Sequence, residues 1–147
     1  MKELFVFIDT NWEVKKFILN AWKKAILVYS KYFSLEKKYE IITVNDFDKY
    51  CHIIRETRPK WGVTKQKFEK IFIYNPIAWT EKETGHKPAD IVSSIFHQLF
   101  HVYCYNHKLE LPKWLEEGIA TYISQDFDGG QKDTDFLKLK KQNTEIH

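Results

Sequence analysis

Two histidines four residues apart, His97 and His101, are the residues of this chain whose types and spacing point most directly to chemistry. Side chains four apart on an α-helix lie on one face, about one turn from each other, so both imidazoles can reach a single ion. Gln98 follows the first histidine and is turned about 100° around the helix axis, so its side chain flanks the ion. The pair therefore predicts a metal site on a helix, with an amide beside it.

A histidine pair leaves a zinc ion short of protein ligands, because zinc takes four in a tetrahedron and a catalytic site keeps one position for water. Glu117 lies sixteen residues after His101, in a second segment that a short turn can fold back against the first. Its neighbour Glu116 is an equal candidate on spacing alone, and His86 and His107 are near enough in sequence to compete. Structural histidines on a packed helix would show the same spacing, so the residues alone leave the third ligand open.

A second motif follows the histidine pair. The chain reads His-Gln-Leu-Phe-His over residues 97–101 and Leu-Pro-Lys-Trp-Leu-Glu-Glu-Gly-Ile-Ala-Thr-Tyr over residues 111–122. These segments resemble the gluzincin zinc metallopeptidases, closest to the peptidase MA-like and minigluzincin group, whose pattern is H-E-x-x-H followed by P-x-W-L-x-E-G-x-A-x-Y. The resemblance implies that His97, His101 and Glu117 bind zinc, because the ligand in those families is the glutamate directly before the glycine.

Position 98 departs from that pattern. The family carries a glutamate there that accepts a proton from the attacking water and later delivers it to the leaving amine, and an amide cannot accept this proton. The resemblance therefore implies a zinc metallopeptidase scaffold with little or no activity, in which Gln98 occupies the position of the general base. Two origins of Gln98 stay open: a natural pseudopeptidase that binds a peptide or protein partner, and a substitution that silenced an active enzyme. The competing hypothesis is an interaction protein that binds no metal.

Hydrophobic periodicity predicts the elements that position these residues. Helices are predicted over residues 12–33, 47–55, 90–107 and 113–124, with Asp9, Thr10 or Asn11, Asn45-Asp46, and Asp90 as N-caps. Strands are predicted over residues 39–44 and 71–74, with residues 4–8 as a short strand or extended lead-in. Residues 57–67 are expected to form a loop or a poorly ordered strand, and residues 78–88 a surface loop.

These elements predict a single α+β domain over residues 1–125 and a polar C-terminal tail over residues 126–147. The expected architecture is a backing helix, a small mixed β-sheet, an active-site helix and an antiparallel glutamate-bearing helix. The resemblance, which covers roughly residues 10–125, implies the same order and hence a minimal zincin-like domain. A bound peptide is expected to lie along an edge strand near residues 71–74.

The composition of the chain restricts the classes of partner that we expect it to bind. The formal charge is +3, carried by dispersed lysines with only two arginines, which argues against a nucleic-acid partner. The N-terminal apolar run, residues 4–8, is too short for a signal peptide or a membrane span. Cys51 and Cys104 form no Cys-x-x-Cys pair and are expected to be reduced thiols, so a cytoplasmic location is expected. The expected partner is a peptide or protein substrate, and the sequence leaves the oligomeric state open.

Overall fold

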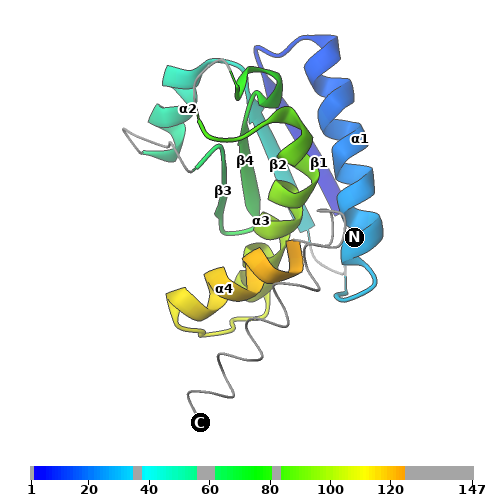
Figure 1. Ribbon diagram of the computed structural model, residues 1–147, viewed down its shortest axis with the longest axis vertical. Helices are drawn as coiled ribbons and strands as arrows, with labels where there is room; N and C mark the ends of the chain where they lie inside the picture. Colours follow the sequence, from blue (N-terminus) through cyan, green and yellow to red (C-terminus); the bar gives the residue numbers. More distant parts are fainter. Residues whose placement is uncertain (1, 35–37, 56–61, 81–83, 125–147) are drawn as a thin grey trace.

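The computed structural model describes residues 2–34, 38–55, 62–80 and 84–124. The predicted tail over residues 126–147 lies outside this part of the chain. The main elements, in order, are β1 (Lys2–Ile8), α1 (Trp12–Tyr29), β2 (Lys38–Val44), α2 (Phe47–Ile54), β3 (Thr64–Lys67), β4 (Lys70–Tyr74), α3 (Ile91–Asn106) and α4 (Lys113–Ser124). Short 3-10 turns span Pro76–Ala78 and Pro88–Asp90. The predicted α+β class, with four helices and a mixed sheet among the described residues, is confirmed (Figure 1).

The four strands form one sheet in the order β1-β2-β4-β3. β1 pairs with β2 and β2 with β4 in parallel, whereas β3 runs antiparallel to β4. β4 is therefore an interior strand with a partner on each side, and the expectation of an edge strand near residues 71–74 is wrong. The edge next to α3 belongs to β3, whose sequence Thr-Lys-Gln-Lys lacks the apolar residues that mark a buried strand.

The helices α1 and α3 pack against each other, and α3 also packs against β3, β4 and α4 (Figure 1). Helical spacing places Ile18, Trp22 and Tyr29 of α1 in the core, as the periodicity predicted. The Tyr29 ring meets the Phe96 ring of α3 edge-on, with centroids 5.5 Å apart. Burying side chains of this size contributes about 1.5–3 kcal/mol each, so this packing fixes the helix that carries the histidine pair.

The ends of the first helix differ in how well the sequence predicted them. Asn11 is the N-cap among the three candidates, since its Oδ1 accepts a hydrogen bond from the Val14 amide at 2.9 Å. The predicted C-terminus at residue 33 is wrong, because α1 ends at Tyr29. The Ser30 hydroxyl donates to the Leu27 carbonyl at 3.1 Å, and tight turns follow. Tyr32 and Phe33, which the predicted helix included, lie beyond the end of α1, where their rings contact each other and the Tyr32 ring contacts Phe96.

Two further predictions around the second and third helices have different outcomes. Asp46 caps α2 as expected, accepting from the Lys49 amide at 2.9 Å. Asp90 precedes α3 but makes no capping bond, because its carboxylate accepts from the Lys87 amide at 2.9 Å. The segment 78–88 was predicted to be a surface loop, and residues 81–83 lie outside the described residues. Trp79 is nevertheless buried, and its indole donates to the Tyr74 carbonyl at 2.8 Å.

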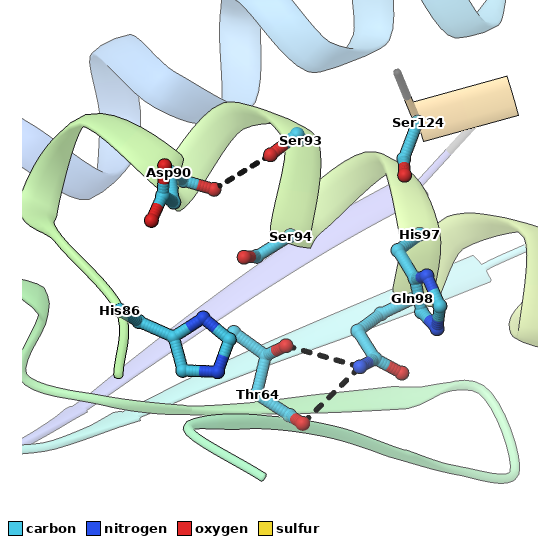
Figure 2. A pocket seen from close by; sticks show the side chains of 8 residues that line it. All are labelled: Thr64, His86, Asp90, Ser93, Ser94, His97, Gln98 and Ser124. Atoms are coloured by element: carbon cyan, nitrogen blue, oxygen red, sulfur yellow. Dashed lines mark hydrogen bonds between the residues drawn. The ribbon is translucent and has the colours of Figure 1, made fainter. Parts of the chain in front are cut away.

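This arrangement places one turn of α3 between α4 and the β3 edge. Figure 2 shows His97 and Gln98 on that turn, with Gln98 directed at Thr64 of β3. Within the described ranges, no helix combines the length and the apolar character that crossing a membrane requires.

Candidate metal centre

The helices α3 and α4 bring the three predicted ligands together. Nε2 of His97 lies 3.2 Å from Nε2 of His101, so the two imidazoles converge as the four-residue spacing predicted. The carboxylate of Glu117 meets both rings, with Oε2 3.3 Å from His97 Nε2 and Oε1 2.9 Å from His101 Nε2. Among the described residues these three form a group that could hold a metal ion.

The spacing of these atoms fits the ligand shell of a small metal ion. Metal–nitrogen and metal–oxygen bonds of about 2.0–2.1 Å in a tetrahedron separate neighbouring ligand atoms by about 3.3 Å. The separation of the two imidazole nitrogens, 3.2 Å, and that of His97 Nε2 and Glu117 Oε2, 3.3 Å, lie close to that edge length, while the other oxygen of Glu117 lies 2.9 Å from His101 Nε2. Two imidazoles and one carboxylate are also a donor set that leaves one tetrahedral position open.

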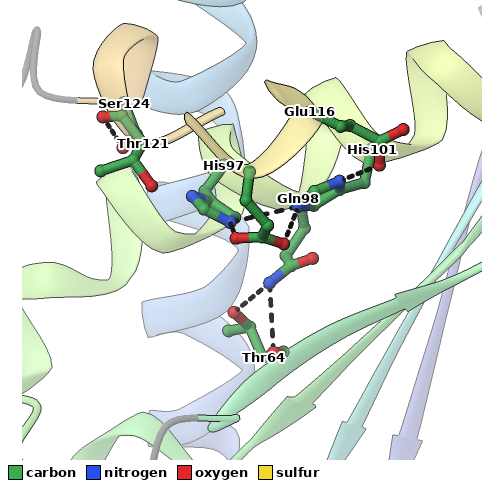
Figure 3. Close-up of polar contacts among 8 residues, drawn as sticks. Thr64, His97, Gln98, His101, Glu116, Thr121 and Ser124 are labelled. Carbon is green, nitrogen blue, oxygen red and sulfur yellow. Dashed lines mark hydrogen bonds and ion pairs between the residues drawn. The ribbon is translucent and has the colours of Figure 1, made fainter. Parts of the chain in front are cut away.

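Glu116, the competing candidate, binds the outer side of the same histidine. Its Oε2 lies 2.5 Å from Nδ1 of His101, on the ring atom that faces away from His97 (Figure 3). A carboxylate on the outer nitrogen fixes the tautomer and the orientation of a metal-binding histidine. The adjacent glutamates therefore have different positions: Glu117 at the centre and Glu116 behind it.

The hydrogen bond to Glu116 has a consequence for the inner atoms. When Nδ1 of His101 carries the donated proton, a neutral ring has only a lone pair on Nε2. That lone pair faces an oxygen of Glu117 at 2.9 Å, which can only accept, and Nε2 of His97, which accepts or donates according to the tautomer of that ring. The contact between His101 and Glu117 becomes favourable with a cation between the two atoms, either a metal ion or an additional proton on His101.

The environment of His97 favours its neutral form. Burial lowers the pKa of this imidazole, the adjacent His101 lowers it further, and the nearby Glu117 opposes both. A neutral imidazole is the form that ligates metals, so the lowered pKa reduces the competition between protons and a metal ion.

The side chain of Gln98 bridges α3 and the β3 edge. Its Nε2 donates to the Thr64 carbonyl at 3.1 Å and to the Thr64 hydroxyl oxygen at 3.0 Å (Figure 3). The preceding residue, Val63, directs its carbonyl to β4 by accepting from the Tyr74 amide. Carbonyls alternate along a strand, so the Thr64 carbonyl lies on the free edge of the sheet. The amide nitrogen of Gln98 is thus hydrogen-bonded to a carbonyl on the free side of the edge strand.

The amide at position 98 matches this partner better than a carboxylate would. A backbone carbonyl can only accept, so the group beside it has to donate, and the amide nitrogen has two hydrogens. An ionised glutamate at position 98 would place an oxygen against the Thr64 carbonyl oxygen and would lose that hydrogen bond. The structure therefore gives Gln98 a positive role as a cross-link between helix and strand.

The remaining candidates lie outside the ligand group. His86 lines a cavity next to it, and the His107 ring packs on Tyr103 with centroids 4.2 Å apart. Cys51 and Cys104 are free thiols, as expected. Burial, and then Glu116, raise the pKa of the Cys104 thiol to about 12, so this side chain is a neutral neighbour of the centre.

Two contacts were not predicted from the sequence. Thr64 lies in a segment expected to be a loop or a poorly ordered strand, and no residue pattern connects it with Gln98. Glu116 was considered only as a rival ligand, although its place before Glu117 on a helix turns it to a different side of His101.

Comparisons of this chain with protein families, with curated proteins and with solved structures found no match.

Proposed function

We propose that this protein binds zinc through His97, His101 and Glu117 and uses the centre to bind peptides, with little or no hydrolysis. The observation that carries the proposal is the convergence of two imidazole nitrogens and a carboxylate, with a second carboxylate behind one imidazole. Zinc is the proposed ion because two histidines and one glutamate are the ligand set of zinc peptidases, to which the sequence motifs are similar.

Gln98, which lies beside the centre, favours peptide binding over peptide hydrolysis. A bound zinc ion would polarise a peptide carbonyl and acidify water, but hydrolysis also needs a group that accepts and returns a proton. Gln98 stands where that group is expected and its nitrogen is engaged by Thr64. Its amide can orient a ligand by hydrogen bonding, but it cannot transfer protons at neutral pH.

The edge strand β3 is the proposed docking line for the peptide. Backbone groups at alternate residues of an edge strand face away from the sheet, and an extended peptide pairs with them. In β3 these residues are Thr64 and Gln66, which lie on the side of α3. Because Gln98 already occupies the Thr64 carbonyl, we expect a peptide to use fewer backbone bonds here than a free edge would provide.

In a second candidate function, the protein has the same fold but binds no metal ion. Protonation of His101 would let its ring donate to Glu116 and Glu117 at once, at 2.5 and 2.9 Å. The same contacts then form an ion-pair network in an interaction protein. In both cases a cytoplasmic location, favoured by two free thiols, is part of the proposal.

Metal analysis separates these two functions. Protein stripped with a chelator and dialysed against zinc is expected to retain about one zinc per chain, measured by mass spectrometry of the metal and by calorimetry. His97→Ala, His101→Ala and Glu117→Gln are expected to lose it. His107→Ala is the matched control, because this histidine ends α3 without facing the centre. Wild-type protein that retains no zinc after reconstitution would overturn the proposal.

Peptide binding is tested on the same preparations. Fluorescent peptides from a mixed-sequence library should bind with zinc and lose affinity when a chelator removes it. Mass spectrometry of the recovered peptides should show them intact. Rapid cleavage by the wild-type protein would contradict the role assigned to Gln98.

A further inference from the structure

A polar cavity of about 280 Å³ lies next to the candidate metal centre, over the first half of α3 (Figure 2). His97 and Gln98 line it on the side of the centre, and Thr64 lines it from β3. The described residues that line it are all polar, unlike those of most ligand pockets, which are lined largely by apolar groups. A ligand that enters this space gives up its hydration, so it has to form hydrogen bonds with the walls.

Two adjacent serines of α3 differ in whether their hydroxyls are available. Ser93 donates to the Asp90 carbonyl at 3.0 Å and is thereby occupied. Ser94 lies four residues before Gln98, on the same face of the helix. Figure 2 shows its hydroxyl directed into the space above His86, and no described residue forms a hydrogen bond with it. Ser94 therefore offers a donor and an acceptor to a ligand.

His86 contributes the opposite wall. Its ring packs edge-on against Trp79, with centroids 5.9 Å apart, which holds it in place. Its Nε2 is buried and has no hydrogen-bond partner among the described residues. Because Nε2 is buried, a ligand in the cavity meets the other ring nitrogen, Nδ1, which Figure 2 shows on the side of Ser94.

The charges around the cavity select against ionic ligands. Among the described residues that line it there is no lysine or arginine to pair with an anion. The one carboxylate among those residues, Asp90, accepts from the Lys87 amide at 2.9 Å. The groups that face the space are a hydroxyl, an imidazole and an amide, which suit an uncharged ligand with both a donor and an acceptor.

We propose that this cavity is a subsite for a hydroxyl or carboxamide side chain, that of Ser, Thr, Asn or Gln, of a peptide bound at the metal centre. The inference rests on the proposed function and adds to it a preference at one peptide position. Ser94 and His86 are the residues that set the preference. The other side of the centre has a different hollow, of about 470 Å³, whose lining includes the charged residues Lys108 and Glu110, so the preference for uncharged side chains is assigned to one side of the centre.

The test is a positional scan with the zinc-loaded full chain. Capped hexapeptide amides carrying each amino acid in turn at each position compete with a fluorescent peptide, and affinities are measured by polarisation with zinc and with a chelator. At one position we expect the hydroxyl and carboxamide residues to bind about fivefold more tightly than leucine, lysine or glutamate, the effect of one or two added hydrogen bonds.

Three substitutions assign the preference to the cavity. Ser94→Ala and His86→Phe should each reduce it to within about twofold, and phenylalanine keeps the ring contact with Trp79. Ser93→Ala is the matched control and should leave the preference unchanged, because that hydroxyl already bonds to Asp90. None of the three changes a proposed metal ligand, so the zinc content should stay at one per chain.

The outcomes separate this inference from the function on which it rests. Peptides that bind only with zinc but without a polar preference, or with a preference that Ser94→Ala and His86→Phe both leave intact, would overturn the subsite alone. A preference for charged or large apolar residues would do the same. Absence of any zinc-dependent peptide binding would overturn the proposed function together with the subsite.

Discussion

The polar side of α3 contacts two elements at the same turn, α4 and β3, and these contacts differ in kind. Toward α4, His97 and His101 meet the carboxylates of Glu117 and Glu116, so this interface is ionic and its inner atoms converge on one point. Toward β3, Gln98 forms two neutral hydrogen bonds with Thr64. The adjacent residues His97 and Gln98 therefore belong to different interfaces, one that holds the candidate metal group and one that joins the helix to the sheet.

In the proposed function, this difference assigns metal binding and the position of the proton acceptor to separate interfaces of one helix. The ligands on the α4 side depend on α3 and α4 alone. The position that would supply a proton acceptor depends on what β3 presents to it, and here β3 presents a carbonyl that needs a donor. A change on either side should therefore affect one property and spare the other.

The largest effect is expected on the rate of peptide hydrolysis, when the residue of α3 that faces β3 is replaced by a charged one. Gln98→Glu supplies a carboxylate beside the centre and should raise zinc-dependent peptide hydrolysis by roughly 10²- to 10⁴-fold, the usual contribution of a general base. Mass spectrometry of a peptide library after incubation measures the rate, with chelator-treated protein as the control. A variant that holds zinc and still cleaves nothing would show that the site was never built for hydrolysis.

A smaller effect is expected from the carboxylate behind His101. Glu116→Gln removes the charge that orients this ring and should weaken zinc binding about 10- to 100-fold, the range seen for outer partners of metal ligands. Calorimetric titration measures the affinity. Glu110→Gln, an exposed glutamate outside the ligand group, is the control. Equal affinities for both variants would contradict the role of Glu116.

The cross-link to β3 should matter for stability but not for zinc. Gln98→Met keeps the length of the side chain and leaves both Thr64 oxygens without their donor, at a cost of about 1–2 kcal/mol in the free energy of unfolding. Urea denaturation of the metal-free protein measures it. Zinc affinity should remain within about twofold of wild type, and a large loss would show that the two interfaces are not independent.

The smallest effect concerns Cys104, whose thiol lies near the Glu116 carboxylate. Burial and then Glu116 raise its pKa to about 12, so only roughly one thiol in ten thousand is ionised at pH 8. Alkylation by iodoacetamide should be slow and rise about tenfold per pH unit. Glu116→Gln should accelerate it several-fold by removing the charge. Alkylation of folded wild-type protein at the rate of a free cysteine would contradict this environment.

Local patterns predicted much of this molecule. The spacing of His97 and His101 fixed a shared helical face, and the apolar periodicity of α1, α3 and α4 identified the helices that carry and support the ligands. These features depend on residues within one or two turns of each other, so a single sequence contains them.

Features that depend on distant partners were not predictable in the same way. The polar strand β3 forms because β4 offers a free edge, and the contact between Gln98 and Thr64 joins residues 34 apart in sequence. Asp90 looked like a cap, but the Lys87 amide competes for its carboxylate. In each case the partner was set by the tertiary structure, which local propensity does not encode.

X-ray absorption at the zinc edge tests the central claim most directly, because it reports the atoms bound to the ion. For the reconstituted protein we predict two imidazole nitrogens and only oxygen besides, at about 2.0–2.2 Å, and loss of one imidazole in His97→Ala. A sulfur ligand at about 2.3 Å, which would bring Cys104 into the shell, or a protein that holds no zinc, would contradict the account.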